Sequence, residues 1–385
     1  MADGARRSRR RLRLAARIAG LALAAVLLLA LAAAVATPMG RYVARAAWEE
    51  GKILARRRAI ADILADTGSA STVTSGERRR LQLVVDARTF AATAIALDAG
   101  ESFTTYSALT RDTLVLVLSA ARRDTLAPYT WWFPVVGRFP YKGFFDFGEA
   151  QRTAASMRRG GLDTYVRPAS AFSTLGWFND PLLSTTLAMD SLDLANTVIH
   201  ELTHNTLFVK HEVTFNESFA SFVGARGAIE FFRSRGAPRA SKLLEAEWRD
   251  QKLLGSFWGA TLAAVDSAFA QHPRDSTARV AARDTVFARM RQVLLRDLAP
   301  RLPTVPRPQL QRLPLDNAAL LARQVYAADL WLFDAVHARA GGTIGQTVAL
   351  VARLVRESPR DPFGALRRWL DASRPEHSPS ATGGG

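Results

Sequence analysis

The segment His200-Glu201-Leu202-Thr203-His204 contains residue types that could bind a metal ion and use it chemically. Histidines four positions apart lie on one face of an α-helix, so both imidazoles can reach the same ion. Glu201 could act as a general base toward a water molecule whose pKa a zinc ion lowers to about 7. The chain has no cysteine, so a metal would need nitrogen and oxygen ligands. The motif predicts zinc-assisted hydrolysis; the alternative is two structural core histidines.

A catalytic zinc site needs a third protein ligand, and four residues downstream could supply it. They are His211, Glu212, Glu217 and Glu230. The metzincin spacing would require histidine where the chain has Lys210. We expect Glu217, because the apolar spacing of residues 215–223 predicts a buried helix in which an unpaired carboxylate would be costly. The alternative is a carboxylate stabilised by the N-terminal dipole of that helix.

The elements that must position these residues indicate a predominantly helical α+β fold. We expect helices at 43–66, 76–99, 148–159 and about 280–298, nearly continuous helix from Ser191 onward, strands at 113–119 and 163–167, and short strands and turns from Tyr129 to Phe147. The interpretation is a zincin-like metallopeptidase domain over residues 38–372, with a small mixed sheet preceding the active-site helices. Residues 373–385, rich in Pro, Ser and Gly, are expected to be disordered.

The beginning of the chain combines a basic flank with an apolar run. Residues 1–17 contain seven arginines, and residues 18–36 carry no charge. About 20 apolar residues suffice to cross a bilayer, so we expect a transmembrane anchor at 18–37 with the flank 1–17 in the cytoplasm. This places the protein in a bacterial inner membrane, with the catalytic domain facing the periplasm or the cell exterior. A cleaved signal peptide is the alternative, since Ala34-Val35-Ala36 could be a cleavage site.

The formal charge of +16 does not by itself indicate nucleic-acid binding. Beyond residue 17, 44 basic and 34 acidic side chains leave about +10 over the rest of the chain. Much of this excess lies on periodic helical segments, which is typical of solvated helix faces. We therefore expect a peptide substrate and a membrane as partners, and no nucleic acid.

The segment from Thr197 to Gly224 resembles the active-site block of the bacterial Putative aminopeptidase family, whose exported members carry the His-Glu-x-x-His motif. Further similarity lies in Ala55 to Asp66, Thr105-Tyr106, Phe133 to Gly137, Tyr141 to Asp146 and Ser173 to Thr185, and the resemblance covers most of residues 40–340. It implies a gluzincin-like zinc aminopeptidase that hydrolyses N-terminal peptide bonds. The Asn-Glu-x-Phe-Ala pattern around Glu217 is similar to the third-ligand helix of gluzincin aminopeptidases, although its interval from His204 is shorter.

Two further regions could contact a substrate. The resemblance includes a tyrosine after the segment Leu315 to Ala318, and Tyr326 could donate a hydrogen bond to a developing oxyanion. The alternative for Tyr326 is a half-buried packing residue. In the loop from Ser173 to Pro181, the backbone around Gly176 and Trp177 could pair with an extended peptide. Asp180 could bind the ammonium group of a substrate, or else cap a turn before Pro181.

The sequence therefore predicts a zinc-dependent aminopeptidase that holds Zn²⁺ with His200, His204 and Glu217. One alternative is a membrane-anchored zinc endopeptidase that cleaves envelope proteins. The other is a non-catalytic metal-binding scaffold, which Glu201 disfavours, because a structural metal site does not need a general base.

Overall fold

The computed structural model describes residues 36–66, 73–109, 115–133, 137–169 and 181–372, together with 15, 17–26, 28–30 and 32. The chain divides into two compact units, one with residues 1–56 and 133–137 and the other with residues 57–132 and 138–385. The predicted flank 1–17 lies mostly outside the described residues, and the predicted tail 373–385 lies entirely outside them.

The helix predicted at 43–66 is in fact two helices separated by a strand. Helix α2 spans Pro38–Ala55, β1 spans Arg58–Ala59 and α3 spans Ile60–Ala65. The Thr37 hydroxyl caps α2 by accepting a hydrogen bond from the Gly40 N–H at 2.9 Å. The interruption arises because β1 pairs with a strand from residues 105–107, a tertiary interaction that helical periodicity cannot reveal.

The strands form three small sheets instead of the single mixed sheet that we expected. The remaining strands are β2 (Thr105–Ser107), β3 (Leu116–Arg122), β4 (Trp131–Phe133), β5 (Gly137–Phe139), β6 (Tyr141–Phe144), β7 (Leu162–Pro168) and β8 (Leu182–Leu183). In the first sheet β2 is antiparallel to β1 and parallel to β8. In the second, β3 is antiparallel to both β6 and β7, and β4 pairs with β5. The strand predicted at 113–119 is confirmed from residue 116, and that at 163–167 is confirmed in full.

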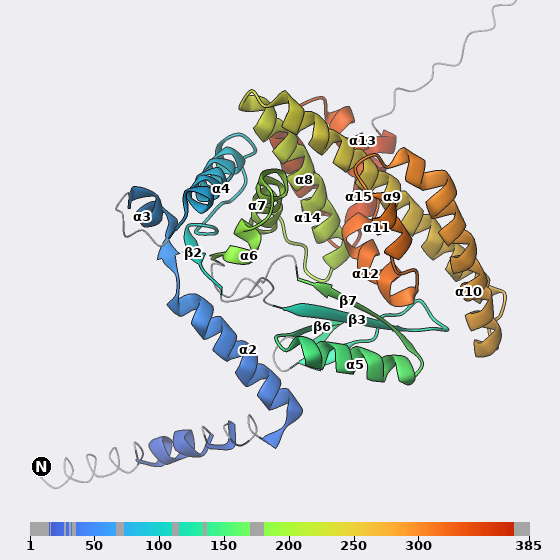
Figure 1. The fold of residues 1–385 in the computed structure, drawn as a ribbon, viewed down its shortest axis with the longest axis horizontal. Helices are drawn as coiled ribbons and strands as arrows, with labels where there is room; N and C mark the ends of the chain where they lie inside the picture. Colours follow the sequence, from blue (N-terminus) through green and yellow to red (C-terminus); the bar gives the residue numbers. More distant parts are fainter. Residues whose placement is uncertain are drawn as a thin grey trace, which may run out of the picture. The chain divides into compact units, whose positions relative to one another are not determined.

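The sheet β6-β3-β7 lies between a helix and the helical body of the larger unit. Helix α5 (Phe147–Arg159) begins at Asp146, whose carboxylate accepts a hydrogen bond from the Glu149 N–H at 2.8 Å. Helix α5 packs on one side of β3 and β7, and α12 (Asn317–Ala327) packs against the same strands from the helical body (Figure 1). The buried Leu118 and Phe144 of the sheet meet small alanines of α5. This packing fixes β7 beside α12.

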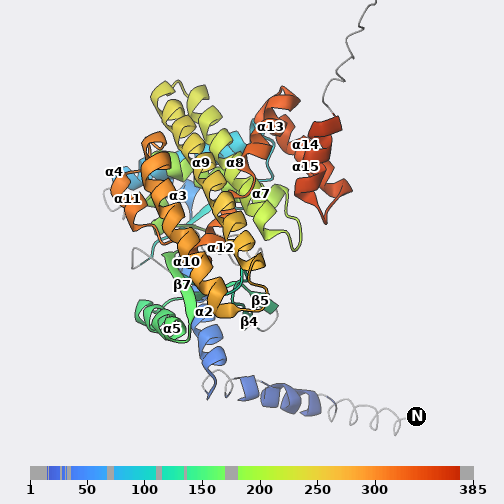
Figure 2. The same cartoon turned by 90° about the vertical axis from the view of Figure 1, so that its right-hand side faces the viewer.

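Helices dominate the chain after residue 183, as predicted. They are α6 (Ser184–Leu187), α7 (Ser191–Thr206), α8 (Val213–Ser234), α9 (Pro238–Ala270), α10 (Ser276–Gln292), α11 (Arg307–Arg312), α13 (Leu330–Ala340), α14 (Ile344–Glu357) and α15 (Pro362–Ala372). Helix α10 continues through a π-helical turn, Val293–Leu298, and a 3₁₀ turn, Ala299–Arg301. Figure 2 shows α9 and α10 side by side and α13, α14 and α15 gathered together. The predominantly helical α+β class is confirmed.

The predicted helix at 76–99 forms α4 (Ser75–Thr93) but ends six residues early. The chain turns away because Ala96 adopts a left-handed φ of 62° and the Leu97 N–H bonds to the Ala91 carbonyl at 2.9 Å. Helix α4 starts with a capping box between Thr74 and Glu77 and packs against α7. It therefore supports the helix that carries the two histidines.

Among the described residues, α9 is the helix that is long and apolar enough to cross a membrane by length and composition. It contains the buried Asp250 and Lys252 and packs against α8, α10 and α12, so it is an internal helix of the fold. The predicted anchor at 18–37 coincides with a shorter apolar helix, Arg17–Ala30, that runs over residues outside the described ones.

Candidate metal centre

Helix α7 presents its two histidines on a face that is only partly buried. The Asp190 carboxylate caps the helix by accepting hydrogen bonds from the N–H groups of Leu192 and Asp193, at 2.8 and 3.0 Å. An apolar stripe made of Leu194, Ala195, Val198, Ile199 and Leu202 is completely buried. The histidine side chains remain 16% and 21% exposed, so the opposite face stays open to a ligand.

The turn between α7 and α8 is held by one buried amide. Asn216, in the first turns of α8, is 3% exposed. Its side-chain oxygen accepts from the Val209 N–H and its NH₂ donates to the Val209 carbonyl, both at 2.9 Å. This pair of bonds satisfies buried backbone groups that no helix or sheet satisfies. Asn216 thus fixes the turn and places the adjacent Glu217.

Two glycines let α8 approach α7 closely at the histidine. A methyl group on Gly224 would lie 3.1 Å from the Cβ of His200 and 2.4 Å from the side-chain oxygen of Asn196. A methyl group on Gly227 would lie 2.8 and 2.9 Å from the side chains of Ile95 and Ile199. Either methyl group would force its neighbours to move, so the two glycines permit the close approach of the helices at this crossing. Sequence reasoning did not assign a role to either glycine.

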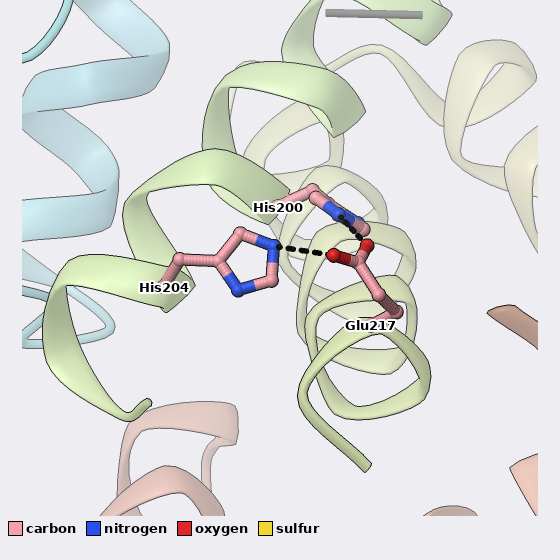
Figure 3. A group of neighbouring side chains, drawn as sticks. All are labelled: His200, His204 and Glu217. Atoms are coloured by element: carbon pink, nitrogen blue, oxygen red, sulfur yellow. Dashed lines mark ion pairs between the residues drawn. The ribbon is translucent and has the colours of Figure 1, made fainter. Parts of the chain in front are cut away.

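His200, His204 and Glu217 converge on one point between α7 and α8 (Figure 3). The Nε2 atom of His200 lies 3.4 Å from one Glu217 carboxylate oxygen, and the Nε2 atom of His204 lies 3.7 Å from the other. One ligand atom from each of the three side chains lies within 4.8 Å of the other two. The structure therefore brings together the three residues that the sequence singled out.

Two imidazole nitrogens and a carboxylate form a donor set that a zinc ion can use. Zinc binds imidazole nitrogen and carboxylate oxygen at about 2.0–2.2 Å in a tetrahedron, which separates neighbouring ligand atoms by about 3.3–3.5 Å. The two nitrogen-to-oxygen distances of 3.4 and 3.7 Å are close to that separation. Small side-chain movements would complete the coordination, and three protein ligands leave a fourth position open.

The charges of the three side chains change one another's pKa values. Burial lowers the pKa of His200, but the hydrogen bond with Glu217 and the charge of Glu201 outweigh burial, so the pKa is raised. Burial and then the charge of His200 lower the pKa of His204 to about 4. Burial acts to raise the pKa of Glu217, whereas the neighbouring histidines and Arg167 lower it more strongly. The carboxylate thus compensates positive charge at this point.

The other candidate ligands lie elsewhere. His211 is exposed in the turn before α8, with a left-handed φ of 71°. Glu212 occupies the position just before α8 and is not part of the cluster. Glu230 lies more than three turns beyond Glu217 on α8, beside Arg226, Arg233 and the backbone of Ile344. Among the described residues, Glu217 is the acid that joins the two histidines.

Tyr326 lies near enough to the cluster for the charge of Glu217 to act on its hydroxyl. Burial and then the negative charge of Glu217 raise the pKa of Tyr326, so its hydroxyl keeps its proton at neutral pH. The hydroxyl of Ser218, next to Glu217, donates to the Val325 carbonyl and accepts from the Ala328 N–H, at 3.2 and 3.1 Å. The backbone on both sides of Tyr326 is therefore tied to α8.

Arg167 on β7 is a second neighbour, which the sequence did not single out. Its guanidinium donates to the Tyr326 hydroxyl at 3.4 Å and lies over the Tyr326 ring, 5.5 Å from the centroid. Its positive charge also acts on Glu217. No motif marks this arginine, because a strand and a helix far apart in sequence meet there. The predicted substrate contacts Gly176, Trp177 and Asp180 lie outside the described residues.

Comparisons with known proteins place this arrangement in one family. The model of the family described as Putative aminopeptidase matches residues 41–363, which include α7, α8 and α12. No curated protein and no solved structure matches the chain. The match extends over most of the chain and contains the clustered histidines, Glu217 and Tyr326. The chain therefore belongs to the Putative aminopeptidase family.

Proposed function

We propose that the chain is a zinc-dependent aminopeptidase with a zincin-like, gluzincin-type catalytic centre. Membership of the Putative aminopeptidase family supports peptide hydrolysis. The single observation that carries the zinc assignment is the convergence of His200, His204 and Glu217 within 4.8 Å. A third ligand that is a glutamate on the following helix is the arrangement of the gluzincins.

Each polar residue of the centre has a role in the proposed reaction. A zinc ion held by His200, His204 and Glu217 would supply a Lewis acid and lower the pKa of a water molecule. Glu201, whose charge acts on His200, accepts the proton of the attacking water and passes it to the leaving amine. Tyr326, protonated at neutral pH, donates a hydrogen bond to the oxygen of the scissile carbonyl. Arg167 positions Tyr326 through its hydroxyl and ring.

We further propose that the protein is anchored in a bacterial inner membrane by residues 18–37, with the catalytic unit outside the cytoplasm. The described apolar side chains of this run are exposed, for example Leu21 at 72% and Leu29 at 70%. Apolar surface of this kind is stable in lipid and costly in water. A reporter enzyme fused after Gly385 should be active only outside the cytoplasm. Release of the fusion from membranes by a high-salt wash would contradict the anchor.

The metal assignment is tested by substituting two carboxylates of α8 and its preceding turn. The full chain, purified in detergent, should bind one equivalent of zinc. The Glu217→Ala variant should lose most of it, because two imidazoles alone do not complete the site, whereas Glu212→Ala should retain it. Equal zinc contents in wild type and Glu217→Ala, measured by atomic emission, would remove Glu217 from the ligands.

The catalytic assignment is tested with the Glu201→Gln variant at full zinc occupancy. The amide keeps the shape of the side chain but cannot accept a proton, so activity should fall at least about 10²–10⁴-fold. Peptides with a free N-terminus should be cleaved and their acetylated counterparts should not. Cleavage of acetylated peptides would favour the endopeptidase alternative. Wild-type turnover in Glu201→Gln would show that Glu201 is not the general base. A wild-type protein that binds zinc but cleaves no peptide would favour the alternative of a non-catalytic metal-binding scaffold.

A further inference from the structure

A cavity of about 390 Å³ lies next to the candidate metal centre. Ser221 lines it from α8, one helical turn after Glu217, and its hydroxyl donates to the Glu217 carbonyl at 2.8 Å. Tyr326 and Arg167 also line it, so the same two residues border the cavity and the centre. A substrate whose scissile bond lies at the centre would therefore place a neighbouring group in this cavity.

One wall of the cavity is an arginine held between two aromatic rings. The guanidinium carbon of Arg323, on α12, lies 4.9 Å from the Trp258 ring centroid and 5.3 Å from that of Tyr165. Trp258 is only 4% exposed, so it restricts the guanidinium firmly. The Nε atom of Arg323 is buried and has no hydrogen-bond partner within the described part of the chain. Within the described residues, the two rings therefore position this guanidinium, without a hydrogen bond at Nε.

The other wall provides a second guanidinium. Arg167 and Tyr165 are two residues apart on β7, which places their side chains on the same face of the strand. Arg167 makes two weak neutral contacts, with the Tyr326 hydroxyl and the Pro168 carbonyl, both at 3.4 Å. Within the described ranges, no carboxylate oxygen lies within the 4.0 Å of an ion pair with Arg167 or Arg323.

Both guanidinium groups line the same cavity. Burial lowers the pKa of Arg323; Tyr165 and Asp316 act to raise it, and the charge of Arg167 acts to lower it. The acids that act on them have other partners: Asp316 caps α12 through the Ala319 N–H, and Glu217 faces the two histidines. Two arginines held close together in a partly desolvated cavity with aromatic walls form a site for an anion.

We propose that this cavity binds a carboxylate group of the peptide substrate, so that the enzyme prefers acidic peptides. The inference rests on the proposed function, because it assigns the carboxylate to the substrate of the same centre. The carboxylate belongs either to an Asp or Glu side chain beside the scissile bond or to the C-terminus of a short peptide. Arg323 and Arg167 donate to it, and the apolar faces of Trp258 and Tyr165 contact its methylene groups.

Three pairs of peptides test the preference and identify the source of the carboxylate. They are Glu-Ala-Ala-amide with Gln-Ala-Ala-amide, Ala-Glu-Ala-amide with Ala-Gln-Ala-amide, and Ala-Ala-Ala acid with Ala-Ala-Ala amide. The zinc-loaded full chain should cleave the carboxylate member of at least one pair with a kcat/KM at least about tenfold higher, which is typical of a charge-assisted hydrogen bond. The pair that responds distinguishes a side-chain from a terminal carboxylate. Values within threefold in all three pairs would overturn the proposal.

Substitution of Arg323 tests the assignment of the cavity. Arg323→Gln should reduce the preference to within about threefold. Arg323→Lys keeps the charge without the planar fork and should have an intermediate preference. The matched control is Arg233→Gln, which removes one exposed arginine in the last turn of α8 and should keep the wild-type preference. A full preference in Arg323→Gln would exclude this cavity.

A binding measurement separates this inference from the proposed function. Calorimetry on chelator-treated full chain should show at least about tenfold tighter binding of the carboxylate member of the responding pair, and loss of that difference in Arg323→Gln. If no peptide is cleaved but this difference is present, the proposed function fails and the carboxylate site stands. If peptides are cleaved and the chelator-treated chain shows no difference for any pair, the carboxylate site fails and the peptidase stands.

Discussion

Substitution of Gly224 by alanine should disturb the candidate metal centre without replacing any of its three ligand residues. The added methyl group would lie 3.0 Å from the Asn196 carbonyl oxygen and 3.1 Å from the Cβ of His200. Ordinary contacts begin near 3.4 Å, so α7 and α8 must separate by about 0.3–0.4 Å even after the Asn196 side chain rotates away. Metal-ligand distances vary by only about 0.2 Å, so the shift exceeds what the site accommodates.

The energetic effect of Gly224→Ala follows from two opposing contributions. Overpacking a tight interface costs about 1–3 kcal/mol, whereas replacing glycine by alanine inside a helix contributes about 1 kcal/mol of stability. If about 1–2 kcal/mol of the strain falls on the ligands, zinc affinity should decrease about 5- to 30-fold. Global stability should change little, because the helical gain offsets part of the strain.

Competition with a chromophoric chelator gives the zinc dissociation constant, and thermal unfolding of the metal-free protein gives the stability. The matched control is Gly259→Ala on α9, where a methyl group meets no atom within 4 Å. This control should keep wild-type zinc affinity and gain slightly in stability. Wild-type zinc affinity in Gly224→Ala would refute the argument that the helix crossing at Gly224 sets the position of His200.

Three further outcomes are expected. Tyr326→Phe should keep its zinc but lower kcat about 10²-fold, the usual cost of losing a donor to an oxyanion; an unchanged kcat would make the tyrosine a packing residue. Asn216→Ala leaves the Val209 N–H buried without a partner, whereas the Val209 carbonyl still accepts from the Glu212 N–H at 3.1 Å, so the free energy of unfolding should fall by about 1–3 kcal/mol in urea titrations. The hydrogen bond from Thr74 lowers the pKa of Glu77 in the folded protein. The ionised carboxylate therefore stabilises the fold above the unfolded-state pKa of Glu, about 4.3. That stabilisation is lost as the pH falls through the pKa of Glu77 in the folded protein. Glu77→Gln should therefore lower the melting temperature at pH 7, and this effect should disappear as the pH falls below the lowered pKa of Glu77.

Local patterns in the sequence were sufficient to single out the three residues that the fold brings together. The four-residue spacing of His200 and His204 places them on one helical face in any helix, and α7 has that form. Glu217 was identified because a carboxylate within an apolar helix requires a partner, and the cluster supplies two. The sequence also predicted α5 and the helical second half, because helical patterns depend on residues close in sequence.

Other features were decided only by tertiary contacts. The helix predicted at 43–66 is broken because β1 pairs with β2, and the expected mixed sheet is three sheets because strand pairing depends on distant partners. Arg167 and Arg323 border one cavity only because β7 packs against α12. No local pattern in either segment predicts that the two segments meet. The sequence alone determined which residues can do chemistry, since that depends on residue type and local spacing. The tertiary structure determined what surrounds them, since the close approach of α7 and α8 at Gly224 and the pairing of two arginines require segments that meet only in the folded chain.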